Sequence, residues 1–157
     1  MTLFTAFQRS RAPIDDAVDG DRLHRPGVRL KLARRVYADS QGSIDIAPTD
    51  HGVIYVASAT NGEMLGGATT AKLASSHGVG HTRWNRESGY MFVGVLAEGV
   101  QLAVIADDGA EIPAPVNTDG AYWFSVANAV AMLWTAADGT RERIELAEPR
   151  ISGPRTG

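Results

Sequence analysis

Four dipeptides of the Asn-Gly or Asp-Gly type, all after residue 36, constrain this 157-residue chain more than any other feature. They are Asn61-Gly62, Asp108-Gly109, Asp119-Gly120 and Asp138-Gly139. Such pairs are typical of tight hairpin turns, of type I′ in the case of Asn-Gly, because glycine adopts a positive φ without steric cost. Short apolar and alternating runs separate the turns at intervals of about 8–12 residues. From residue 36 onward, the sequence therefore predicts a mainly β fold, an antiparallel β-sandwich or partly closed barrel of roughly seven to nine strands.

The longest apolar run, Tyr90–Leu96, is expected to be a central strand buried on both faces. Five later strands are expected to form one antiparallel meander, at residues 100–106, 110–116, 121–126, 130–136 and 140–146. The second of them contains Pro113 and Pro115, which lack the amide donor of a central ladder, so we expect it at a sheet edge. The last alternates basic and acidic residues, which is typical of a protected, exposed edge.

Alternation with a period of two places Tyr122 and Phe124 on one face of their strand and Trp123 on the other. Neither face of this strand is polar, and the same holds for residues 130–136. We expect both faces to be covered, either by a second sheet or by a partner subunit. Trp123 and Trp134 are expected in the core.

Charge divides the chain into an N-terminal arm and a β domain. Residues 1–37 carry a net charge of +4 and the remainder −7, which together make the formal charge of −3. We therefore assign a basic arm with short helices to residues 1–35, a β domain to 36–148 and a flexible tail to 149–157. The arm is expected to dock on the acidic body, or else to bind an anionic partner.

Three segments outside the clear strands carry weaker patterns. Pro13–Val18 predicts a short helix, because proline and acidic residues suit a first helical turn. Residues 28–36 fit either a helix or a strand, and a helix is favoured. Thr69–Gly89 has little periodicity, and we expect a long loop there.

Several chemistries are excluded by the residues that the chain lacks. Without cysteine there is no disulfide, no Cys-ligated metal and no thiol nucleophile. No apolar run approaches the ~18 residues of a membrane-spanning helix. The glycine-rich segment Gly62–Gly67 is not followed by Lys-Ser or Lys-Thr, so it is not a P-loop. The start has no signal-peptide apolar region, and we expect a cytoplasmic protein.

Two histidines are the candidate metal ligands. His77 and His81 stand four residues apart, but the two glycines between them favour a loop over the helix on which zinc proteases use this spacing. His51 or Glu87 would have to supply a third ligand. A small metal-dependent enzyme at these residues is our third hypothesis. The leading hypothesis is a non-catalytic protein that needs no cofactor.

An aromatic and basic group forms the candidate binding site. Trp84 is flanked by Arg83, Arg86 and Tyr90, and an exposed tryptophan among arginines can stack on a sugar, a base or a partner side chain. Nucleic acid is a less favoured partner, because the pI is about 5.8 and few aromatics accompany the basic residues. The residues that would neutralise phosphates are Arg22, Arg25, Arg29, Lys31, Arg34 and Arg35.

Two segments carry a resemblance to a family. Phe4–Arg9, followed by Ala12–Asp15, resembles the F-x-x-F-x-R … A/T-x-x-D opening of uncharacterised actinobacterial β-rich proteins. Val93–Val100 is similar to their V-x-G-L-V-P-D-G-V strand–turn–strand. This chain departs from them in the central turn, where Ala97-Glu98 stands in place of Pro-Asp, and in having no cysteine. The resemblance implies a β-rich architecture and carries no activity and no site residue.

Together these patterns favour a non-catalytic interaction or structural module that acts through protein–protein contacts, in a homo-oligomer or a larger assembly. The alternative is a ligand- or glycan-binding module that uses the Trp84 segment. Two-sided apolar strands and the edge at residues 110–116 favour the first hypothesis.

Overall fold

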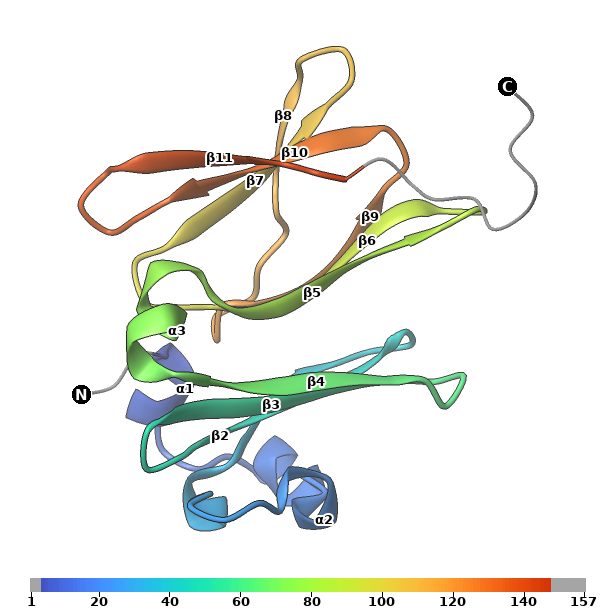
Figure 1. Cartoon of the computed structure of the whole chain (residues 1–157). Helices are drawn as coiled ribbons and strands as arrows, with labels where there is room; N and C mark the ends of the chain where they lie inside the picture. Colours follow the sequence, from blue (N-terminus) through green and yellow to red (C-terminus); the bar gives the residue numbers. More distant parts are fainter. Residues whose placement is uncertain (1–3, 148–157) are drawn as a thin grey trace.

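The computed structural model describes residues 4–147 and is mainly β. Eleven strands, more than predicted, form three antiparallel sheets stacked as layers (Figure 1). Helix α2 (Gly20–Leu23) lies on the outer side of the first sheet, and α1 (Thr5–Gln8) lies beside α3 (Ala71–His77) (Figure 1). Within residues 4–147 no sheet closes into a barrel, so the sandwich alternative is confirmed. In that same range, no helix has both the length and the apolar character needed to cross a membrane.

The first sheet is a meander of four strands in chain order. Its strands are β1 (Arg34–Ala38), β2 (Gly42–Pro48), β3 (Gly52–Ala59) and β4 (Met64–Thr70). Helix α3 (Ala71–His77) leads from it into the middle sheet of β5 (Gly78–Asn85), β6 (Gly89–Leu96) and β9 (Ala121–Val126). The third sheet has the order β11-β10-β7-β8. Its strands are β7 (Gln101–Ala106), β8 (Glu111–Pro113), β10 (Ala129–Thr135) and β11 (Arg141–Glu145).

The middle sheet is buried on both faces, as the apolar run in β6 predicts. Val93 and Trp123 pack against the first sheet, whereas Phe92 and Tyr122 pack against the third. The alternation predicted for β9 is therefore confirmed. A second sheet, rather than a partner subunit, covers each face of this layer. Trp134 is buried between the middle and third sheets.

The predicted single meander after residue 100 is wrong in one respect. Strand β9 leaves the third sheet and pairs with β6, in a register that joins Tyr90 to Val126. Strand β10 then returns to pair with β7 and β11. The edge position of β8 and that of β11 are confirmed, although β8 covers only Glu111–Pro113.

The predicted loop at residues 69–89 is also wrong, because the segment contains α3 and the whole of β5. Its glycines suit close packing rather than a loop. A Cβ added at Gly80 would lie 2.7 Å from the Tyr122 hydroxyl, and one added at Gly94, its partner in β6, would lie 2.6 Å from the same oxygen. The Tyr122 ring thus lies over two strands, a contact that sequence periodicity does not reveal.

The four Asn-Gly and Asp-Gly turns of the β domain share one geometry, which differs from the type I′ turn expected at Asn61-Gly62. In each, the glycine amide donates to the carbonyl three residues earlier, as Gly62 does to Ala59 at 3.0 Å, and only the glycine has positive φ. A type I′ turn needs positive φ at two residues. The observed form is a type I turn with a left-handed glycine. Three of these turns close the antiparallel hairpins β3–β4, β7–β8 and β10–β11, whereas Asp119-Gly120 leads from β8 of the third sheet into β9 of the middle sheet.

The arm consists of α1 (Thr5–Gln8), α2 (Gly20–Leu23) and the 3-10 turns η1 (Pro13–Ala17) and η2 (Leu30–Leu32). The short helix expected after Pro13 is present as η1. The helix favoured for residues 28–36 is wrong, because η2 spans three residues and β1 begins at Arg34. The strand alternative holds from Arg34 to the end of that segment, because these residues pair with β2.

An ion-pair network centred on Arg9 and Asp15 joins the arm to the body through Asp119 and the amide of Arg35 in β1. Asp15 is fully buried and accepts hydrogen bonds from Arg9 at 2.8 and 3.0 Å. Arg9 also donates to Asp119, in the turn before β9, at 2.9 and 3.2 Å. Further along the arm, Leu23 and Ala33 pack on the outer face of the first sheet. This docking places α2 beside β3 and β4.

Candidate functional site

The candidate site is the free edge of the first sheet. Within residues 4–147, β4 pairs with β3 and with no other strand. Five of its seven residues are exposed and two are half-buried. Its sequence, Met64–Thr70, contains no charged residue and no proline. Such an edge presents unpaired N–H and C=O groups along its length.

The register shows which main-chain groups of β4 are free. Ala71 donates to the His51 carbonyl at 2.8 Å, and hydrogen-bonded pairs recur at every second residue of an antiparallel ladder. The N–H and C=O groups of Gly66 and Ala68 therefore point away from β3. These two residues form the middle of the free edge.

The other sheet edges of the described residues differ from β4. Strand β1 begins with two arginines, and β5 carries a histidine and an arginine. Strand β8 is short and contains a glutamate and a proline, and β11 alternates arginine and glutamate. Strand β9 is uncharged, but half of its residues are buried. Among the six edges, β4 alone is both uncharged and without a buried residue.

A cavity of about 480 Å³ adjoins this edge on the side of the arm. Strands β3 and β4 form its floor, and the helix α2 region forms its wall, as the position of α2 below these strands indicates (Figure 1). The lining residues are Asp21, Arg22, Arg25, Ile54, Tyr55, Val56, Met64, Leu65, Gly66, Gly67 and Ala68. We call this cavity the β4 groove.

Small residues keep the β4 groove open. A Cβ added at Gly66 would lie 2.6 Å from the Tyr55 carbonyl oxygen, so glycine is required there. A Cβ added at Gly67 would project to the opposite face, where the nearest atom is a Tyr55 ring carbon at 3.8 Å. On the groove face, the middle of β4 therefore carries only Gly66 and Ala68. Met64, the first residue of β4, is 54% exposed. The floor is thus apolar and shallow beside the free edge.

Two arginines and one aspartate supply the charge of the β4 groove. Arg22 donates to the Ser58 hydroxyl at 2.7 Å and pairs with Asp19 at 3.3 Å. Arg25 is exposed, and its guanidinium donates to the His24 carbonyl at 2.7 Å. Asp21 is the single acidic residue of the lining. The groove therefore carries a net positive charge.

The aromatic and basic group predicted around Trp84 is only partly brought together. Trp84 and Tyr90 form a cross-strand pair of β5 and β6, and both are half-buried. The Tyr90 hydroxyl donates to the Ala147 carbonyl. Arg83 instead forms an ion pair with Glu63 of the first sheet, and Arg86 is exposed in the following turn. Arg83 lines a cavity of about 200 Å³ whose lining does not include Trp84.

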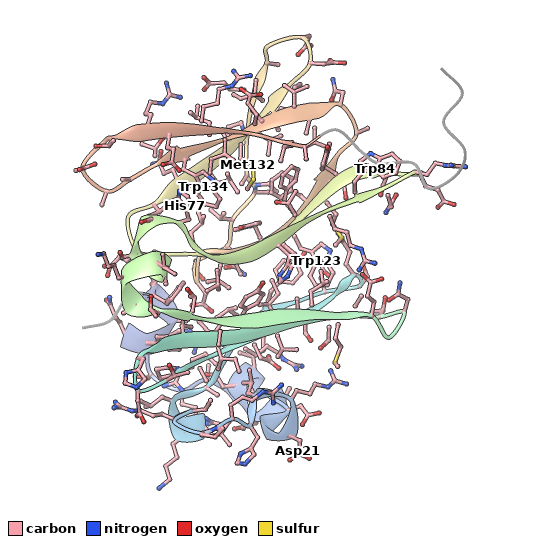
Figure 2. All side chains as sticks on the ribbon, viewed as in Figure 1. Asp21, His77, Trp84, Trp123, Met132 and Trp134 are labelled. Atoms are coloured by element: carbon pink, nitrogen blue, oxygen red, sulfur yellow. The ribbon has the colours of Figure 1, made fainter. Side chains whose placement is uncertain are left out.

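The two predicted metal ligands contact different sheets. His77 stacks on Trp134 with 4.3 Å between ring centroids, and its Nε2 lies 3.1 Å from Glu142 of β11 (Figure 2). His81 is hydrogen-bonded through Nδ1 to the hydroxyl of Tyr55 in β3. Burial raises the pKa of Tyr55 to about 12. Across residues 4–147, no three His, Cys, Asp or Glu side chains gather in a way that could hold a metal ion.

The predicted phosphate-binding arginines mostly have partners inside the chain. Arg35 donates to Asp45 at 2.8 and 3.1 Å, Arg34 lies 3.8 Å from Asp15, and Arg29 lies 3.6 Å from Asp50. The first of these pairs raises the pKa of Arg35. The pairs of Arg29 and Arg35 join the arm to acidic residues of the first sheet and the turn beside it, whereas the pair of Arg34 lies within the arm.

Sequence reasoning missed the β4 groove, because its two sides lie about forty residues apart in the chain. The available signal was the uncharged run of Met64–Thr70 directly after an Asn-Gly turn, which indicates an unprotected strand. Comparison with protein-family models, curated proteins and solved structures finds no match for the chain. The family resemblance of the N-terminal segment stays a prediction.

Proposed function

We propose that the chain is a non-catalytic interaction module that binds a second polypeptide by strand addition at β4. The observation that carries this proposal is the free, uncharged edge of β4 beside an open groove. In strand addition, an extended segment pairs its main chain with a sheet edge, and pockets beside the edge receive alternate side chains. Strand β4 and the β4 groove supply these two elements.

The free groups of β4 match what an added strand needs. Gly66 and Ala68 each direct one donor and one acceptor outward, and an antiparallel partner pairs with both. Neither residue has a side chain that could block the approach. In contrast, a charged edge such as β11 discourages pairing, because the added strand would have to desolvate its arginines and glutamates.

Replacing Ala68 with proline tests the proposal. Proline removes the outward amide donor and places its ring in the path of an added strand, while no β3–β4 hydrogen bond is lost. We expect binding of an extended peptide to weaken at least about tenfold, which is about 1.4 kcal/mol. The free energy of unfolding should change by less than about 1 kcal/mol, because the edge accommodates proline.

The measurement is fluorescence anisotropy with two labelled seven-residue peptides, Thr-Val-Glu-Val-Glu-Val-Thr and its analogue with glutamine in place of glutamate. Ala68→Ser is the matched control, since it keeps the amide. Binding of either peptide that persists in Ala68→Ser and is lost in Ala68→Pro supports strand addition. Absence of binding by both peptides, or equal binding to Ala68→Pro, would contradict it.

A further inference from the structure

We infer that the strand added at β4 is acidic on the face that lies over the β4 groove, where Arg22 and Arg25 bind its carboxylates. This inference rests on the proposed strand addition and names the chemistry of the partner. The occupant is an extended segment of another protein with acidic residues at alternate positions. Complementarity with the two guanidinium groups is the argument for it.

The geometry of a sheet places alternate side chains of the added strand on the groove side. A strand next to β4 would run 4.7–4.9 Å from it, and every second side chain would project to the same face as Gly66 and Ala68. That face is the floor of the β4 groove, whose wall carries Arg22 and Arg25. Because the floor bears only small side chains near its centre, projecting carboxylates have room beside the wall.

The charges of the wall favour an anionic side chain. Among the described residues, Arg25 forms no ion pair, so its guanidinium keeps donors for a ligand. Arg22 already pairs with Asp19, at a site where both side chains are more than 40% exposed, and such exposed pairs exchange readily. Asp21 offsets one positive charge. Counted over the lining alone, Arg22 and Arg25 against Asp21 leave one positive charge, and Asp19, which pairs with Arg22, lies outside the lining.

Arginine is well suited to binding the carboxylates of an added strand, because its planar guanidinium binds a carboxylate through two parallel hydrogen bonds. The apolar part of the floor adds contact with the methylene groups of a glutamate. Ile54 and Val56 supply that surface beneath the arginines. A neutral or basic strand gains the main-chain bonds alone, because it offers no carboxylate to the guanidinium of Arg25.

The test uses the same two peptides with an arginine variant. We expect wild-type protein to bind the glutamate peptide about tenfold more tightly than the glutamine peptide. In Arg25→Gln this preference should fall to less than about threefold. Added salt should weaken binding of the glutamate peptide alone, since screening acts on exposed charges.

Arg86→Gln is the matched control, because it removes the same charge from an exposed turn away from the β4 groove. It should keep the full preference for glutamate. Equal affinity for both peptides that is lost in Ala68→Pro would overturn this inference and leave strand addition standing. Light scattering that shows a dimer of the free protein, broken by Ala68→Pro, would assign the edge to a second copy and also overturn it.

Discussion

Replacing Asp15 with alanine is expected to lower the free energy of unfolding by about 3 kcal/mol. Asp15 is fully buried and accepts four hydrogen bonds, two from Arg9 and one each from the main-chain amides of Ala12 and Arg35. Without the carboxylate these donors lose their acceptor, and the partly buried guanidinium of Arg9 loses one of its two acidic partners. Chemical denaturation followed by tryptophan fluorescence measures the change.

The same residue should make stability depend on acid pH. Burial alone would raise the pKa of Asp15, but hydrogen bonds from Arg9 and from two backbone amides outweigh it and lower the pKa from 3.8 to about 2. A lowered pKa stabilises the fold above pH 4, and this stabilisation is lost as the pH falls toward 2. Over this range the wild type should lose about 2 kcal/mol more stability than Asp15→Ala, because the lowered pKa values of Asp39 and Asp138 act in both proteins.

Asp16→Ala is the control for both measurements. Asp16 adjoins Asp15 but is 75% exposed, and its pair with Arg11 is a surface contact. We expect a change of less than about 0.5 kcal/mol. If Asp15→Ala were as stable as Asp16→Ala, the buried ion pair would not be what fixes the arm to the body.

Two adjacent residues of β6 should both prove essential to stability. Phe92→Ala is expected to lose about 4 kcal/mol, and Val93→Ala about 2 kcal/mol, because both side chains are fully buried. Phe92 stacks on Phe124 at 5.2 Å toward the third sheet, whereas Val93 packs toward the first. In a two-layer sandwich one of two adjacent strand residues would face solvent.

Ile144→Ala in β11 is the matched control, since Ile144 is 39% exposed, and its loss should stay below about 1 kcal/mol. Thermal or chemical denaturation of the three variants measures the pattern. A near-neutral result for either Phe92→Ala or Val93→Ala would contradict the stacking of three sheets.

The candidate site was less accessible from the sequence than the fold was. Trp84 was predicted to form a binding site with the arginines beside it. Strand alternation instead places Arg83 on the opposite face, where it pairs with Glu63. The spacing of His77 and His81 indicated a chelate, yet each imidazole contacts a different sheet. Residue type and spacing do not report which layer a side chain faces when the segment is a strand between two sheets.

Local chemistry in the sequence determined the hairpins, the protected edge of β11 and the two-sided burial of β6. Each of these depends on neighbours along the chain: a glycine that accepts positive φ, alternating charges, and an unbroken apolar run. Tertiary structure alone decided that β9 joins β6, and that α2 lies against β3 and β4 to form the β4 groove. A period of two shows which residues share a face but not which strand lies beside them, because main-chain pairing is the same for every neighbour.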